Sequence, residues 1–266
     1  MAMLHSANIS IMIKAARKAS TKLKRDYGEI EQLQVSRKGP ADFVTAADIR
    51  TEKTLRETLS HARPEYGFLM EEGGEISGKD TARRWIIDPI DGTTNFIHGI
   101  PYFAISIALQ EYDQITAGVI YEPINDQMFW AERGNGAWLN DRRMRVSGRT
   151  NMEQSIFATG IPFLGRGDHK KFLEQIEAVM AVSAGIRRFG SAALDLAYVA
   201  AGRFDGFWEN GLQPWDIAAG IIIVREAGGM VSEINGRDAM LKTGSILASN
   251  PNLHKALGQI IINKVE

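Results

Sequence analysis

The stretch WIIDPIDGTTNF, from Trp85 to Phe96, places two carboxylates, a proline and a glycine directly after an apolar segment. The β-branched and aromatic residues at its start predict a buried strand. Pro89 is expected to end that strand, with Asp88 at its last position and Asp91 inside the turn that follows. Because open sheets place ligands at strand ends, both aspartates are candidate ligand-binding residues.

The second half of the stretch has the residues of an anion site. Gly92 permits a backbone conformation that a side chain would block, and Thr93 and Thr94 suit the start of a short helix whose free amides can hold an anion. An ordinary surface β-turn is the alternative, since Asp, Pro and Gly gather in turns regardless of function. The apolar run from Tyr102 to Leu109 favours a site beside the core, where neighbouring carboxylates need a cation between them.

This stretch resembles the signature of the inositol monophosphatase family, the lithium-sensitive, magnesium-dependent phosphomonoesterases. Two further blocks extend the resemblance along nearly the whole chain: GSAALDLAYVAAGRFDGFWE, from Gly190 to Glu209, and ENGLQPWDIAAG, from Glu209 to Gly220. Within the family, the chain resembles bacterial members of the suppressor-protein type. The resemblance implies a homodimeric phosphatase of myo-inositol monophosphate with an α/β fold, a layered αβαβα sandwich.

The resemblance also implies a metal site made of four acids and one carbonyl. GFLMEEGG supplies Glu71, the first acid of a Glu-Glu pair. Glu71, Asp88 and the backbone carbonyl of Ile90 would hold one Mg²⁺. Asp88, Asp91 and Asp216 would hold a second. Ligands that are all oxygen suit Mg²⁺ better than Zn²⁺. Considered alone, Glu71 could be a solvated loop charge and Asp216 a helix cap.

Catalytic and substrate-binding roles follow from the same resemblance. Asp48, in TAAD, matches the aspartate that hydrogen-bonds the threonine of the DGTT turn, so Thr93 would orient and help deprotonate the attacking water. Asp48 could equally be a plain helix cap. The amides of Gly92 and Thr93 would hold the phosphate. The predicted catalytic residues are Thr93, Asp48, Glu71 and Asp91. The groups expected to meet the hydroxyls of the alcohol are Asp91, the backbone of Ala192 and the carboxylate of Glu209.

Composition is that of a globular enzyme. A chain of 266 residues with 44% hydrophobic residues can bury a sizeable core. The net charge of −1 gives no reason to expect nucleic acid or a bilayer as the main partner. No apolar run reaches the roughly 20 residues of a membrane span. The absence of cysteine removes disulfides, thiolate nucleophiles and Cys-ligated zinc, and suits a cytoplasmic location.

Periodicity and turn residues predict alternating helices and strands. Expected helices cover residues 8–27, 47–61, 172–182, 192–201, 215–227 and 252–261. Expected strands lie at 66–69, 84–87, 115–121 and 128–132, and near Ile105, Ile156, Ile186, Phe204 and Met230. The basic, acid-free segment 1–25 could be a transit peptide, but its helical spacing of apolar residues favours a first helix.

The polar segment from Ser147 to Gln154 is the best candidate for an internal boundary. It divides the chain into an N-terminal α+β part, 1–150, with Glu71 and the DPIDGTT motif, and a C-terminal α/β part, 151–266, with Glu209 and Asp216. We expect the two parts to form one catalytic unit. A polar hairpin carrying Lys38, Gly39 and Pro40 corresponds to a mobile segment that completes the metal site in the family.

Two alternative functions stay open at this stage. Relatives with the same metal core hydrolyse fructose bisphosphate, adenosine bisphosphate or histidinol phosphate. Bacterial relatives of the suppressor-protein type are also associated with RNA polymerase, and Arg187 and Arg188 could form such a contact surface. An arginine pair that is solvated or part of a dimer interface is the simpler interpretation.

Overall fold

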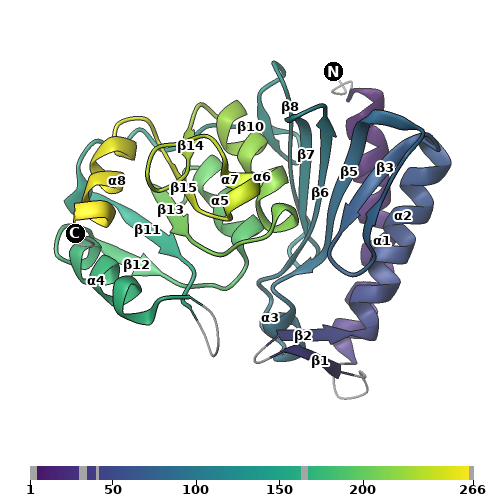
Figure 1. Cartoon of the computed structure of the whole chain (residues 1–266), viewed down its shortest axis with the longest axis horizontal. Coiled ribbons are helices and arrows are strands. Elements are labelled where there is room, and N and C mark those ends of the chain that lie inside the picture. The colour runs from purple at the N-terminus through teal and green to yellow at the C-terminus, as the bar shows by residue number, and fades with distance from the viewer. Residues whose placement is uncertain (1–4, 30–34, 40–41, 163–166, 264–266) are drawn as a thin grey trace.

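The computed structural model describes residues 5–29, 35–39, 42–162 and 167–263, arranged in five alternating layers (Figure 1). Helices α1 (Ala7–Gly28) and α2 (Ala46–Ala62) cover one face of an eight-stranded sheet. Helices α5 (Ala192–Ala200) and α6 (Pro214–Glu226) lie between that sheet and a five-stranded one. Helices α4 (His169–Met180) and α8 (His254–Asn263) form the outer layer. The predicted αβαβα order is confirmed.

The first sheet has the strand order β10-β9-β8-β7-β6-β5-β3-β4. Its strands are β3 (Tyr66–Met70), β4 (Gly74–Ile76), β5 (Asp80–Asp91), β6 (Ala104–Glu111), β7 (Gln114–Glu122), β8 (Gln127–Glu132), β9 (Ala137–Leu139) and β10 (Arg142–Met144). Neighbouring strands run antiparallel except β3 and β5, which are parallel. The short strands β4, β9 and β10 were not predicted, because three residues are too few to show a period.

The second sheet has the order β12-β11-β13-β15-β14. Its strands are β11 (Ile156–Thr159), β12 (Gly185–Arg187), β13 (Gly206–Glu209), β14 (Met230–Ser232) and β15 (Ile246–Ser249). The remaining elements are the β1 (Val35–Gly39) and β2 (Asp42–Thr45) hairpin, α3 (Thr93–Ile97), η2 (Met152–Gln154) and α7 (Met240–Thr243). The hairpin was predicted, but Pro40 and the side chain of Lys38 lie outside the described residues.

The layers follow from how apolar residues are spaced in each helix. In α1, Ile9, Met12, Ala16 and Leu23 share one face and are fully buried, while the opposite face carries exposed cations. In α6, every residue from Ile217 to Val224 is buried, because both sheets contact this helix. A helix that is apolar on all sides must lie inside the molecule, and α6 is therefore a central layer.

Strand β5 differs from its prediction at Pro89. The strand continues to Asp91, so Asp88 is not its last residue and Asp91 is not in the turn. Asp88 pairs with Ser106 and Asp91 with Ala104, which leaves one extra residue on β5 and makes a bulge. Bulges accept proline because the local ladder is already interrupted. The bulge turns both carboxylates toward the same end of the sheet.

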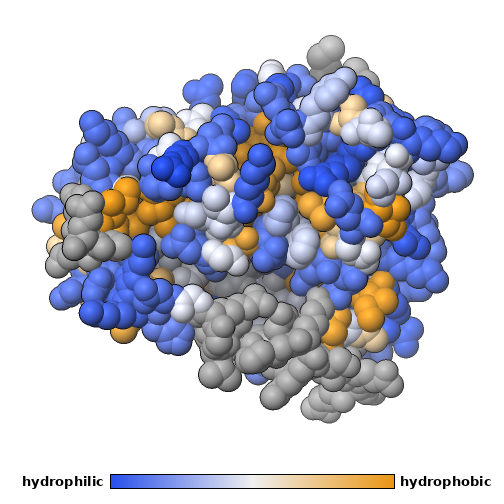
Figure 2. Space-filling model, viewed as in Figure 1, coloured by the Kyte–Doolittle hydropathy of each residue, from blue (hydrophilic) through white to orange (hydrophobic). Residues whose placement is uncertain are grey.

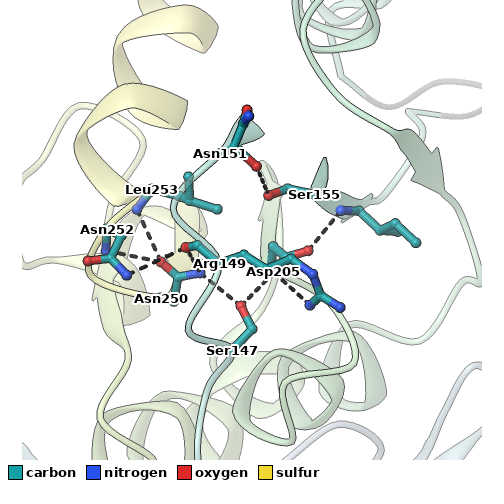
Figure 3. A network of polar contacts seen from close by, with 9 residues as sticks. Ser147, Arg149, Asn151, Ser155, Asp205, Asn250, Asn252 and Leu253 are labelled. Carbon is teal, nitrogen blue, oxygen red and sulfur yellow. Dashed lines mark hydrogen bonds and ion pairs between the residues drawn. The ribbon is translucent and has the colours of Figure 1, made fainter. Parts of the chain in front are cut away.

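A buried polar network ties the segment between the two sheets to β13 (Figure 3). The carboxylate of Asp205, 1% exposed, accepts hydrogen bonds from Ser147 Oγ at 2.5 Å, Arg149 Nη1 at 3.2 Å and the Ile156 amide at 2.8 Å. Asn250 adds bonds from its Nδ2 to Ser147 Oγ and the Arg149 carbonyl. The network fixes where the second sheet starts relative to the first.

Replacing Asp205 by alanine is expected to cost about 2–3 kcal/mol of folding free energy, because the partly buried Ser147 hydroxyl and Ile156 amide and the half-exposed Arg149 guanidinium all lose their acceptor. Asp205→Asn keeps an oxygen acceptor and should cost about half as much. Urea denaturation measures both. Equal stability of the alanine variant and the unmodified protein would mean that the network does not hold the sheets together.

Within the described residues, no helix is long and apolar enough to span a bilayer. Figure 2 shows that the viewed face is mainly hydrophilic, with hydrophobic residues in small, separate patches.

Candidate functional site

Three aspartates converge at the end of the first sheet. Asp88 and Asp91 come from the β5 bulge, and Asp216 comes from the first turn of α6. Each offers a carboxylate oxygen, and these atoms all lie within 4.8 Å of one another. We call Asp88, Asp91 and Asp216 the acidic cluster. The structure thus brings together residues separated by more than 120 positions of sequence.

The electrostatics of the acidic cluster favour a cation. Burial, followed by the charges of Glu71, Asp91 and Asp216, raises the pKa of Asp88 well above its usual value. Burial and then the charge of Asp91 raise the pKa of Asp216 likewise. Buried carboxylates at such spacing repel one another unless a positive charge lies between them. An all-oxygen donor set fits a hard divalent cation such as Mg²⁺.

Glu71 lies at the edge of the acidic cluster. It directly follows β3, and its amide donates to the Ile87 carbonyl of β5 at 3.2 Å. A hydrogen bond with the Glu71 side chain is among the causes that raise the pKa of Asp88. The structure therefore places Glu71 beside Asp88, as the sequence predicts.

The N-terminus of α5 holds Asp91. Ser191, the N-cap residue, donates its hydroxyl to Asp91 Oδ2 at 2.5 Å, and the Ala193 amide donates to the same oxygen at 2.7 Å. Burial raises the pKa of Asp91 to about 6, although hydrogen bonds from Ser191, Ala193 and Ala192 act to lower it. Ser191 and Ala193 were not predicted as site residues; a serine before an apolar helix signals only an N-cap.

Asp48 makes both of the contacts expected from the sequence, one with the start of α2 and one with Thr93. Its Oδ2 accepts hydrogen bonds from the amide and the hydroxyl of Thr45, at 2.8 and 2.6 Å. These bonds cap the N-terminus of α2. Its Oδ1 lies 3.2 Å from Thr93 Oγ1, within hydrogen-bond distance. The Thr93 hydroxyl also lies 3.0 Å from the Ile90 carbonyl, so its single proton has two acceptors. Burial is the main cause that raises the pKa of Asp48.

Gly92 is required by the geometry of the turn. Its φ of 97° lies in the left-handed region, and a Cβ would come within 3.0 Å of the Tyr102 carbonyl oxygen. Asn95 Nδ2 donates to the carbonyls of Tyr102 and Phe189, both at 2.7 Å. The turn that begins α3 is thereby held against the segment before α5.

Glu209 ends β13 within electrostatic range of the acidic cluster. Burial, followed by the charges of Asp195 and Asp91, raises its pKa to about 8, and the guanidinium of Arg188 acts in the opposite direction. Its carboxylate occupies the place where a side chain at Gly160 would point. Arg187 and Arg188 are both exposed. The charge of Arg188 thus acts at the candidate site, which the sequence did not suggest.

The sequence profile of the inositol monophosphatase family matches residues 6–266. The chain belongs to this family. An inositol-1-monophosphatase of Mesorhizobium japonicum is 55% identical over 255 residues, 96% of this chain and 96% of the relative. The extragenic suppressor protein suhB from Bartonella henselae has a crystal structure that matches with TM-score 0.94 at 55% identity, over 96% of this chain and 98% of that one. The Nus factor SuhB of Escherichia coli K12 is 43% identical over 249 residues, 94% of this chain and 93% of the relative.

Family membership makes the chain a phosphatase. The family is metal-dependent, and the acidic cluster supplies a place that could bind a metal. Seven of the residues predicted for the site have side chains that are linked by hydrogen bonds or by the effects of their charges on one another: Asp48, Glu71, Asp88, Asp91, Thr93, Glu209 and Asp216.

Proposed function

We propose that the protein is a Mg²⁺-dependent phosphatase that hydrolyses myo-inositol monophosphate to myo-inositol and phosphate. The observation that carries the metal chemistry is the acidic cluster, three carboxylates that each offer an oxygen within 4.8 Å of the others, with Asp88 buried and Asp91 and Asp216 partly buried. Support for the substrate comes from the inositol-1-monophosphatase of Mesorhizobium japonicum at 55% identity.

Each acidic residue has a proposed place in metal binding. Glu71, Asp88 and the Ile90 carbonyl would hold one Mg²⁺. Asp88, Asp91 and Asp216 would hold another, with Asp88 shared. When bound, Mg²⁺ would acidify the attacking water and neutralise charge on the phosphoryl oxygens.

The remaining predicted site residues would position the attacking water, the phosphate and the alcohol. The hydroxyl of Thr93, oriented by Asp48, would take a proton from the attacking water as it gives its own proton to the Asp48 carboxylate, so that Thr93 stays neutral. The amides of Gly92 and Thr93 would donate to the phosphate. Asp91, the backbone of Ala192 and Glu209 would accept or donate hydrogen bonds to the hydroxyls of the leaving alcohol.

Thr93→Val is expected to lower kcat about 10²-fold, because valine keeps the shape of threonine but cannot relay a proton. Thr93→Ser retains the hydroxyl and should remain within about 5-fold of the unmodified enzyme. Mg²⁺ binding and melting temperature should stay unchanged in both variants. Full activity of Thr93→Val would remove Thr93 from the proton path and leave only its structural role at the start of α3.

Phosphate release from a panel of esters tests the substrate. The panel contains inositol 1-phosphate, fructose 1,6-bisphosphate, adenosine 3′,5′-bisphosphate and histidinol phosphate, each with and without Mg²⁺. We expect kcat/KM to be highest for inositol 1-phosphate, and Glu209→Gln to raise KM for it. A strong preference for another ester would overturn the substrate assignment and leave the metal site intact.

We also propose that parts 1–150 and 151–266 act as one catalytic unit. Asp88 and Asp91 belong to the first part and Asp216 to the second, and α6 packs on strands of the first sheet. A homodimer, lithium sensitivity and a cytoplasmic location stay predictions that rest on the family resemblance and on composition.

A second candidate function is contact with the transcription machinery. The Nus factor SuhB of Escherichia coli, 43% identical, favours it, and Arg187 and Arg188 are exposed. Arg187→Ala is the cleaner test, because the charge of Arg188 also acts on Glu209. We expect the variant to lose binding to RNA polymerase while keeping its phosphatase rate. No binding by the unmodified protein would remove this candidate.

A further inference from the structure

Helix α2 directs two acidic residues toward the candidate site, one helical turn apart. Asp48 reaches Thr93, as described above. Glu52, the second, is only 7% exposed. Glutamate is almost never buried without a hydrogen-bonding or charged partner. A buried carboxylate close to several others must therefore make contacts that outweigh their repulsion.

The carboxylate of Glu52 lies against the turn that follows β3. Its Oε2 accepts the amide of Glu72 at 2.8 Å. Its Oε1 would lie 2.9 Å from a Cβ added at Gly73, so the absence of a side chain there leaves room for the carboxylate. Both oxygens thus face the backbone of the segment that begins at Glu71.

This contact fixes the backbone on one side of Glu71. On the other side, the Glu71 amide donates to the Ile87 carbonyl in β5 at 3.2 Å. With the peptides before and after its Cα both anchored, Glu71 can direct its side chain only over a narrow range toward Asp88. Of the two anchors, the Ile87 carbonyl is backbone, whereas Glu52 is a side chain that substitution can remove.

We propose that Glu52 is a positioning residue for the metal site, which holds the Glu71–Glu72 peptide so that the Glu71 carboxylate meets the cation. This inference rests on the proposed function, because it assumes that Glu71 is a Mg²⁺ ligand. Partners of metal ligands commonly change metal affinity 10- to 100-fold when they are replaced. In this role Glu52 acts on Glu71 through its hydrogen bond to the Glu72 amide.

The test is calorimetric titration of Mg²⁺ into the metal-free protein, without substrate. Glu52→Ala removes the acceptor and is expected to weaken Mg²⁺ binding about 10-fold. Glu52→Gln keeps an oxygen at the same reach and is expected to bind Mg²⁺ within about 3-fold of the unmodified protein. In turnover assays, Glu52→Ala should need about 10-fold more Mg²⁺ for half-maximal rate, while its kcat at saturating Mg²⁺ stays within a few-fold.

A matched control separates positioning from general loosening of the helix. Leu55 lies on α2, fully buried and pointing into the core. Leu55→Val is expected to lower the melting temperature without changing Mg²⁺ affinity. A merely structural Glu52 would behave in the same way, with a lower melting temperature and unchanged affinity.

The outcomes distinguish this inference from the proposed function. If the unmodified protein turns over without Mg²⁺ and binds none, the proposed function fails. If it binds Mg²⁺ and Glu52→Ala binds it equally well, the positioning role is wrong while the proposed function stands. If Glu52→Gln is weakened as much as Glu52→Ala, the negative charge of Glu52 matters and its hydrogen bond to Glu72 does not, which also overturns the inference.

Discussion

Asp91→Asn is expected to lower the Mg²⁺-dependent phosphatase rate by about 10³-fold or more. The substitution removes a carboxylate from the acidic cluster, and stabilisation of charge by a metal is worth several kcal/mol, at 1.36 kcal/mol for each factor of ten. The amide still accepts from Ser191 and Ala193, so the fold around it should persist. Phosphate release at saturating Mg²⁺ and inositol 1-phosphate measures the effect.

Asp126→Asn is the matched control for Asp91→Asn. Asp126 is more than half exposed, pairs with Arg17 of α1 and is not part of the acidic cluster. Its substitution should leave the rate within 2-fold. A similar loss of rate in both variants, or none in Asp91→Asn, would contradict the assignment of Asp91 to the metal site.

Removing Mg²⁺ with a chelator is expected to stop turnover and to destabilise the protein more at pH 8 than at pH 5. Burial raises the pKa of Asp91 to about 6 and those of Asp88 and Asp216 above their usual values, so the folded protein binds protons more tightly than the unfolded chain. These three groups contribute their full amount to folding stability below about pH 4. The contribution is lost as the pH rises through their pKa values in the folded protein.

The pH effect can be isolated by comparing metal-free Asp91→Asn with the metal-free unmodified protein. For a shift of about two pKa units, the variant should be about 2–3 kcal/mol more stable at pH 8 and nearly equal at pH 4. With saturating Mg²⁺ at pH 8, the unmodified protein should instead be more stable than Asp91→Asn. Urea denaturation at the two pH values measures this difference. A difference that does not depend on pH would mean that Asp91 is not held in a repulsive cluster.

The three aspartates of the acidic cluster could be singled out from local patterns, whereas the roles of Glu71, Asp48 and Glu209 came from the family resemblance. Asp88 and Asp91 are part of one apolar-flanked motif, and Asp216 opens an apolar helix. Local patterns do not reveal how the backbone bends between them. The β5 bulge at Pro89 was missed because a proline after an apolar run indicates the end of a strand as readily as an interruption in it.

The residues that sequence reasoning missed act over long separations in the chain. Ser191 holds Asp91 across 100 positions, and Glu52 holds the Glu72 amide across 20. Each also has an ordinary explanation in its own segment, a helix cap for Ser191 and a helix surface charge for Glu52. Only the three-dimensional arrangement shows which backbone groups they meet.

The layer order of the fold was likewise beyond what periodicity could show. The run from Ile217 to Val224 is buried on all sides, so it has no polar face to mark its orientation. The run predicts a buried helix, but it does not show which elements lie on each side of that helix. The resemblance to a known family supplied the αβαβα order, and the contacts of α6 with both sheets explain it.

The most direct test of the metal site is a crystal structure with Mn²⁺ in place of Mg²⁺, in which anomalous scattering locates the metal. We expect a strong peak between the carboxylates of Asp88, Asp91 and Asp216, and none there in crystals of Asp91→Asn. A peak only at other carboxylates, with the acidic cluster empty in a crystal that hydrolyses inositol 1-phosphate, would contradict the assignment.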